Sequence, residues 1–106
     1  MVKNVEDITF NYVYRNTKKE GDTNIPFLYQ DTEYMIVIAS DTYPEYPTDK
    51  YFIFIKYEAE YIDYLINTTL SVGFKFKKDA VEYVIDFIKG EYFAEIHNTL
   101  KNTIGY

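Results

Sequence analysis

One stretch of the sequence, Phe74 to Gly90 (FKFKKDAVEYVIDFIKG), combines the signals of a short strand with those of a helix start and stop. Its apolar residues recur at i, i+3, i+4 and i+7, the spacing of one helical face. They are Val81, Val84, Ile85 and Ile88. Asp79 followed by Glu82 predicts a capping box, and Gly90 predicts a left-handed helix end. We expect the rest of the chain to pack against this helix.

Four segments have the pattern of β-strands. Ile8 to Arg15 alternates apolar and polar residues, as in a strand with one face covered. Glu33 to Ser40 and Tyr51 to Tyr57 are almost continuously apolar, which is typical of strands buried on both faces. Val72 to Lys77 alternates again and predicts a fourth strand.

The connections and the remaining helices follow from the same reasoning. Asn16 to Asn24 is polar and predicts an exposed loop, after which Phe27 to Tyr29 predicts a short edge segment. Asp41 to Lys50 contains two prolines and predicts a long hairpin connection. Glu58 to Leu70 is ambiguous, and we favour a short helix there. A final helix is predicted by the spacing of Phe93, Ile96, His97, Leu100 and Ile104.

These elements predict one α+β domain over residues 1–106. Its core is an antiparallel sheet of about four strands, with two or three helices packed on one face. The chain is long enough to form such a core without a disulfide or a metal ion.

Residue counts exclude several kinds of chemistry. The chain has no cysteine and one histidine, so thiolate nucleophiles and multi-histidine metal sites are absent. His97 lies on the apolar side of its predicted helix, where we expect it to serve packing. Glu58, Glu60 and Asp63 could supply paired carboxylates, but such pairs arise by chance in so acidic a chain. We therefore expect no catalytic residues, no metal, no cofactor and no enzymatic activity.

Lys75, Lys77 and Lys78 precede the helix predicted after them, where free N–H groups favour an anion. A phosphate site is one interpretation of this cluster. Because Asp79 is expected to occupy those N–H groups, and because lysines protect exposed strand edges, we favour a structural role.

The charge of the chain points to the nature of a partner. Seventeen acidic and 11 basic residues give a net charge of −6, which argues against direct binding of nucleic acid and favours a basic protein. The 13 tyrosines exceed what a core of this size needs, so some are expected at the surface as contact residues. The codon bias of an AT-rich genome would also raise tyrosine content. The sequence contains neither a secretory signal nor an apolar run long enough for a membrane span, so we expect a cytoplasmic protein.

We predict the partner-binding surface in two groups of acidic residues and tyrosines on either side of the strand Tyr51 to Tyr57. They are Asp41, Tyr43, Glu45, Tyr46, Asp49, Glu58, Glu60, Tyr61, Asp63 and Tyr64. Carboxylates interleaved with aromatic rings can imitate phosphates and stacked bases. The strand between the groups spans about 23 Å, so a single continuous patch is not assured. The alternative is that these acids only solvate the surface.

The chain is short, cysteine-free, acidic and rich in Tyr, Phe, Ile, Lys and Asn, and it has a predicted strand ending GFKF before the helix KKDAVEYVIDFIKG. In these features it resembles the small accessory proteins of phages and mobile elements, among them the anti-CRISPR inhibitors. The resemblance implies an inhibitor that occupies a basic, nucleic-acid-binding site of a host defence effector such as a CRISPR-Cas nuclease. It carries over no individual residues, because these inhibitors share no common motif.

Two other hypotheses remain open. The surplus aromatic residues could bury a subunit interface in a homodimer or larger homo-oligomer that serves as a structural or scaffold protein. A small enzyme that uses carboxylate chemistry is the third and weakest interpretation.

Overall fold

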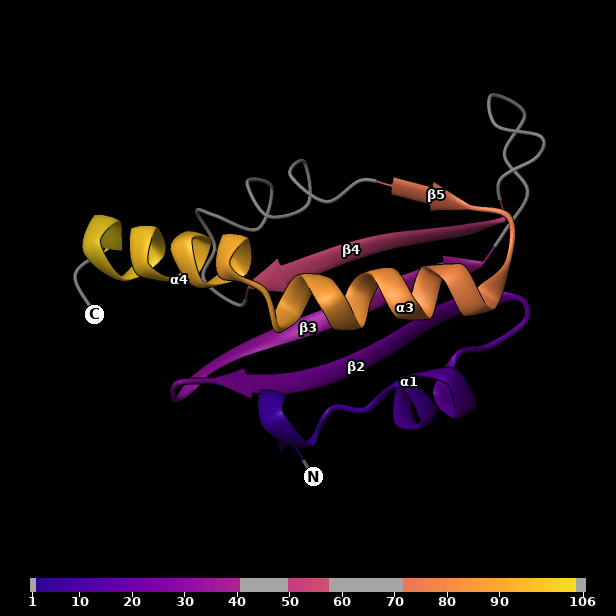
Figure 1. Ribbon diagram of the computed structural model, residues 1–106, viewed down its shortest axis with the longest axis horizontal. Coiled ribbons are helices and arrows are strands. Elements are labelled where there is room, and N and C mark those ends of the chain that lie inside the picture. Colours follow the sequence, from indigo (N-terminus) through magenta and orange to yellow (C-terminus); the bar gives the residue numbers. More distant parts are fainter. Residues whose placement is uncertain (1, 41–49, 58–71, 105–106) are drawn as a thin grey trace.

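The computed structural model describes residues 2–40, 50–57 and 72–104, and five strands in this part of the chain form one sheet (Figure 1). The strands are β1 (Lys3–Asn4), β2 (Gly21–Tyr29), β3 (Thr32–Ser40), β4 (Tyr51–Tyr57) and β5 (Val72–Phe74). Their order in the sheet is their order in the chain. Only the β1–β2 pair is parallel, so the predicted α+β class with a mainly antiparallel sheet is confirmed.

The two central strands lie where their apolar runs predicted them. β4 has the predicted bounds, and β3 begins one residue earlier than expected. Both faces of β3 are covered: Ile36 and Ile38 are fully buried on one face, and Val37 is nearly buried on the other. β3 and β4 are antiparallel neighbours, whereas the predicted hairpin connection between them lies, except for Lys50, outside the described residues.

The prediction of a loop over Asn16 to Asn24 is wrong from Gly21 onward. These residues begin the nine-residue strand β2, and the expected short edge segment Phe27 to Tyr29 is the end of this strand. Thr23, Ile25 and Phe27 are buried while Asp22 and Asn24 are exposed. The strand period therefore continues through polar residues, because only one face of this part of β2 packs against the core.

The strand predicted over Ile8 to Arg15 is also wrong. A single turn of 3-10 helix, η1 (Val5–Asp7), precedes the α-helix α1 (Phe10–Asn16). The Thr9 hydroxyl caps α1 by accepting a hydrogen bond from the backbone N–H of Tyr12, at 3.2 Å. Within the helix, Phe10 and Tyr14 stack at i and i+4, with ring centroids 5.5 Å apart. This cap and this ring pair favour the helix over the strand.

The helix predicted after Phe74 is present as α3 (Lys77–Ile88), but with different ends. It begins at Lys77, so the predicted fourth strand stops at Phe74, and Phe76 is an N-cap without a side-chain hydrogen bond. Asp79 therefore lies inside the first turn, and the predicted capping box is wrong. Gly90 has no positive φ and joins α3 to α4 (Glu91–Ile104). A side chain at Gly90 would place its Cβ 3.0 Å from the Asp86 carbonyl oxygen, which explains the glycine.

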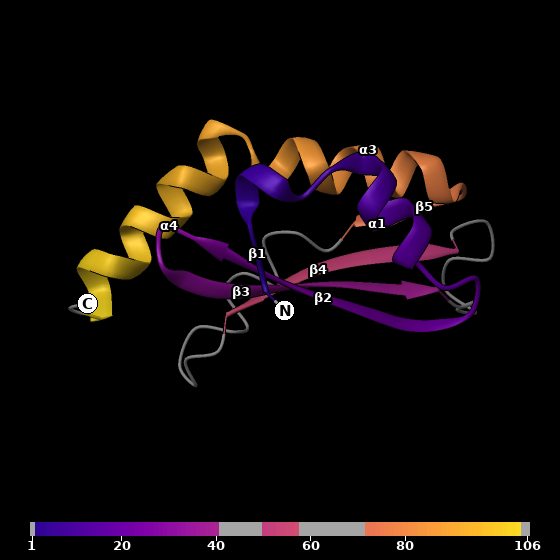
Figure 2. The ribbon, with the colours of Figure 1, turned by 90° about the horizontal axis from the view of Figure 1, so that it is seen from below.

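The described helices α1, α3 and α4 lie on the same face of the sheet, as predicted (Figure 2). The hydrophobic core fills the space between these helices and the inner face of β2, β3 and β4. Its largest fully buried members are Tyr34, Phe27, Phe93, Ile8, Ile36, Ile38, Ile53, Ile55, Ile88 and His97. The predicted short helix over Glu58 to Leu70 lies outside the described residues.

Candidate functional site

All ten residues of the predicted partner-binding surface lie outside the described residues. They belong to residues 41–49 and 58–71, which we name the acidic segments. The described strands fix the points from which these segments leave. Ser40 pairs with Tyr51 at one end of β4, and Tyr57 lies at the other end of β4. The two segments therefore begin at opposite ends of β4, and the predicted partner-binding surface stays a prediction.

The acidic segments carry the whole charge excess of the chain. They contain six of its 17 acidic residues and none of its 11 basic residues. The described part therefore has eleven of each and is neutral. The paired carboxylates Glu58, Glu60 and Asp63 also fall in the second segment, so their geometry is outside the described residues.

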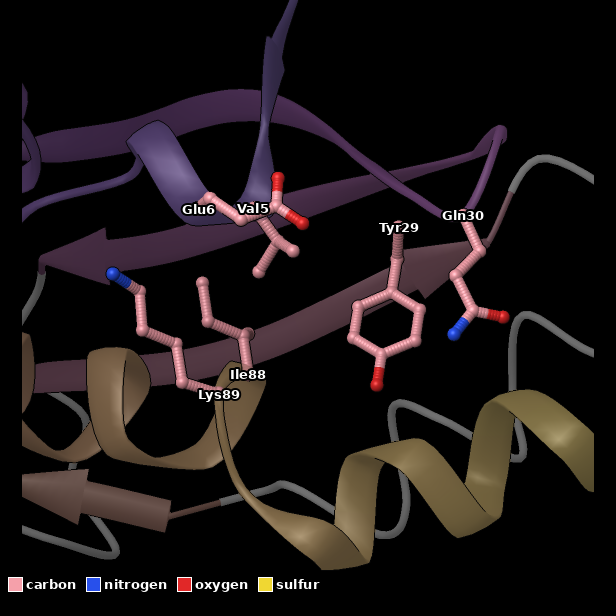
Figure 3. A pocket seen from close by; sticks show the side chains of 6 residues that line it. All are labelled: Val5, Glu6, Tyr29, Gln30, Ile88 and Lys89. Atoms are coloured by element: carbon pink, nitrogen blue, oxygen red, sulfur yellow. The ribbon is translucent and has the colours of Figure 1, made fainter.

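A pocket of about 470 Å³ lies where η1, the β2–β3 turn and the end of α3 meet (Figure 3). It is lined by Val5, Glu6, Tyr29, Gln30, Ile88 and Lys89. In Figure 3 the side chains of Val5 and Ile88 face one another, with the Tyr29 ring on one side of them and Lys89 on the other. The pocket thus combines an apolar middle with charged and amide groups around it.

The polar groups of this pocket are available to a ligand. Glu6, Gln30 and Lys89 are exposed, and neither Glu6 nor Lys89 has an ion-pair partner in the described part of the chain. Gln30 and Asp31 form the two-residue β2–β3 turn with φ values of 48° and 68°, as in a type I′ turn. Asn-Gly and Asp-Gly are the usual sequences there, so this hairpin lacked its ordinary sequence signal.

Behind the pocket lies an aromatic group of the half-buried Tyr29 and the buried Tyr34, Phe93 and His97, which we name the histidine cluster. Tyr29 contacts Phe93 edge to face, with ring centroids 5.1 Å apart, and its ring centroid lies 4.8 Å from that of His97. His97 has no exposed surface, and its Nδ1 is hydrogen-bonded to the Tyr34 hydroxyl at 2.6 Å. His97 is therefore a packing residue, as its place on the apolar helix face predicted.

The electrostatics of His97 follow from this environment. Burial lowers its pKa, and the positive charge of Lys101 lowers the pKa further, so the ring is neutral at pH 7. Its Nε2 is buried and has no hydrogen-bond partner among the described residues. A neutral, deeply buried imidazole is suited to rigid packing rather than to proton exchange with a substrate in solution.

Lys75 and Lys77, near the start of α3, each lie over an aromatic ring. The Lys77 ammonium lies over the Tyr14 ring, 4.2 Å from its centroid, and the Lys75 ammonium lies 5.5 Å from the Phe76 centroid. These cation–π contacts favour the structural interpretation of the cluster. The contact of Lys77 with Tyr14, whose ring stacks on Phe10, attaches α1 to the start of α3. We name Phe10, Tyr14 and Lys77 the lysine junction.

The aromatic surplus is divided between core and surface. Tyr34, Tyr51 and Tyr57 are buried, whereas Tyr92 is 56% exposed and Phe76 is 60% exposed. Tyrosine therefore contributes both to the core and to the surface of the described part of the chain.

Within the described ranges, no three His, Cys, Asp or Glu side chains gather as metal ligands would. Across the same ranges, no helix combines the length and the apolar character that crossing a membrane requires. Comparisons of the chain with protein-family models, with curated proteins and with solved structures find no match in any of the three sets.

Proposed function

We propose that the protein is a non-enzymatic inhibitor of the anti-CRISPR type, encoded by a phage and acting in the host cytoplasm. In this proposal the acidic segments occupy the basic nucleic-acid-binding site of a host defence effector such as a CRISPR-Cas nuclease. The observation that carries the proposal is the charge distribution: the described part is neutral, and the acidic segments hold the entire net charge of −6.

The attachment of both segments to one central strand supports this role. β4 pairs with β3 over its full length and with β5 over three residues, so its position is fixed on both sides. A rigid base reduces the entropy that is lost when charged segments bind a partner. The segments also carry Tyr43, Tyr46, Tyr61 and Tyr64, whose rings can take the place of stacked bases.

A pull-down from bacterial lysate, washed with increasing salt, tests the proposal. We expect a basic, nucleic-acid-binding protein that elutes as salt rises and is displaced by duplex DNA, because both treatments act on charge complementarity. Reversal of Glu45, Asp49, Glu60 and Asp63 to Lys should abolish its capture.

A matched control reverses four exposed acids of the described part, Glu20, Glu82, Asp86 and Glu95, to Lys. Both variants change the net charge by the same amount, so only the position of the charges differs. Equal loss of capture in the two variants would show nonspecific attraction, and unchanged capture in the first would contradict the proposal.

The exposure of Phe76 and Tyr92 favours a second candidate, a homo-oligomeric structural or scaffold protein. Sedimentation equilibrium distinguishes the two. A multimer that dissociates when Phe76 and Tyr92 are replaced by Ser would support the scaffold, and a monomer at all concentrations would exclude it.

A further inference from the structure

The geometry points to a second binding site in the pocket of Figure 3, for a small zwitterion of about dipeptide size. This inference is independent of the proposed function, because it uses only described residues and none of the acidic segments. Glu6 and Tyr29 form the end that binds an ammonium group, Gln30 lines the pocket beside Tyr29, and Lys89 forms the end that binds a carboxylate.

The charges of the pocket carry the first step. Glu6 and Lys89 contribute one charge of each sign, and neither is neutralised by a neighbour in the described part of the chain. In the view of Figure 3 the Lys89 side chain extends away from Tyr29, and the Glu6 carboxylate lies between them. A ligand with both charges can pair with both residues, whereas an ion of either sign is attracted by one and repelled by the other.

The ammonium end has more than one suitable group. An ammonium beside the Glu6 carboxylate can also contact the face of the Tyr29 ring. Tyr29 is held in place by its contacts with Phe93 and His97. The ring is therefore positioned before a ligand arrives, which reduces the entropy lost on binding.

Gln30 provides an independent argument. It adopts φ 48°, a conformation that Gly, Asn and Asp accept more readily than Gln. The type I′ turn explains the positive φ at position 30, but it does not explain why the residue there is Gln and not Gly, Asn or Asp. Residues held in such conformations cluster at ligand-binding sites, and the Gln30 side chain lines this pocket.

The size and the apolar middle of the pocket set the ligand class. Ligand pockets commonly have volumes of roughly 300–1,000 Å³, and this pocket has about 470 Å³. Val5 is half-buried and would contact an apolar side chain, whereas Ile88, which faces it, is fully buried. Lys89 also complements the negative end of α3, but that role needs neither Glu6 nor Gln30.

The test uses the dipeptide alanyl-leucine and its two singly blocked forms, N-acetyl-alanyl-leucine and alanyl-leucine amide. We expect alanyl-leucine to shift the backbone amide NMR signals of residues 5–6, 29–30 and 88–89 in the full chain. Each blocked form should bind about fivefold more weakly, as expected for one partly exposed ion pair.

Two variants identify the residue at each end. Glu6→Gln should weaken alanyl-leucine binding but strengthen binding of the N-acetyl form, because that form has no ammonium and its carboxylate is repelled by Glu6. Lys89→Gln should also weaken alanyl-leucine binding but strengthen binding of the amide form, because that form has no carboxylate and its ammonium is repelled by Lys89. Equal affinity for all three peptides, or no shift of these signals at 20-fold molar excess and above, would overturn the inference.

The turn supplies a further pair of variants. Gln30→Gly should raise the Tm by relieving the backbone and lower the affinity for alanyl-leucine. Asp31→Gly, in the same turn but outside the pocket lining, should raise the Tm and leave the affinity unchanged. Unchanged affinity in Gln30→Gly would exclude Gln30 as a ligand contact.

Discussion

The histidine cluster and the lysine junction both place a basic side chain against aromatic rings, but in opposite environments. His97 has no exposed surface and is kept neutral by burial, whereas Lys77 lies over Tyr14, a ring that is 38% exposed. The comparison shows how solvent decides what a polar contact contributes. A polar group in the core depends on a protein partner for its hydrogen bond, because no water reaches it. At the surface, water can take the place of a lost partner.

The largest effect is expected from Phe93→Ala, which removes the centre of the histidine cluster. Phe93 is fully buried and contacts Phe27, Tyr29 and Tyr34. The resulting cavity should lower the free energy of unfolding by about 3–5 kcal/mol, measured by urea denaturation. A loss of about 0.5 kcal/mol or less, which we expect for a variant of the lysine junction, would show that the buried cluster contributes no more to stability than the exposed junction.

Tyr34→Phe tests the polar contact of the cluster with little change in packing. The variant leaves His97 Nδ1 without the hydroxyl that lies 2.6 Å away. We expect a loss of about 1–3 kcal/mol, the range for an unsatisfied buried polar group. Tyr14→Phe at the lysine junction is the matched control and should change stability by less than about 0.5 kcal/mol.

The pH dependence of stability sharpens the comparison further. The pKa of His97 is lowered from its ordinary value of 6.5, so below that pH the unfolded chain binds a proton that the folded chain does not. The contribution of His97 is therefore fully present above pH 6.5 and is lost as the pH falls toward the lowered pKa. The slope should not exceed about 1.4 kcal/mol per pH unit.

Urea denaturation between pH 5.5 and 8 measures this dependence, in a range where ordinary carboxylates remain ionised. His97→Gln should remove the slope. Lys101→Gln should reduce it, because the Lys101 charge contributes to lowering the pKa. An unaltered slope in His97→Gln would assign the dependence to another group.

Thr9→Ala affects the lysine junction indirectly, by removing the cap of α1. The loss of the Thr9 contact with the Tyr12 N–H should cost about 1 kcal/mol. Hydrogen exchange should show faster opening of Phe10–Asn16 than of α3. Uniform acceleration in both helices would mean that α1 and α3 open as one unit.

Lys77→Met should have the smallest effect, about 0.5 kcal/mol or less, because it removes only the partly exposed cation–π contact with Tyr14. Methionine retains the apolar part of the side chain. A loss above about 2 kcal/mol in urea denaturation would place the lysine junction in the same energetic class as the histidine cluster.

The difference between buried and exposed regions also explains which elements could be predicted from the sequence. β3, β4 and the apolar face of α3 are buried, and burial leaves a clear hydrophobic period in the sequence. α1 has only Val13 among its buried residues, so its seven residues follow no period strongly. Its aromatic alternation fitted a strand, and only the Thr9 cap and the stacking of Phe10 on Tyr14 indicate the helix.

The Figure 3 pocket could not be predicted for a different reason. Its lining comes in three pairs of neighbouring residues, 5–6, 29–30 and 88–89, which are distant in sequence and meet only in the fold. The β2–β3 turn that brings Gln30 there also lacks glycine, so it gave no local signal. The predicted partner-binding residues came from charge and composition, which indicate a kind of partner but not a geometry.

The order of the strands has a consequence for folding kinetics. Each strand from β2 to β5 pairs with the one before it in the chain, so the sheet grows through contacts between consecutive segments. Among the described connections between paired strands, only that between β2 and β3 consists of two residues, and it closes nine paired positions. Closing so short a loop costs little chain entropy. We expect this hairpin to form in the folding nucleus, with β4 and β5 added afterwards in chain order.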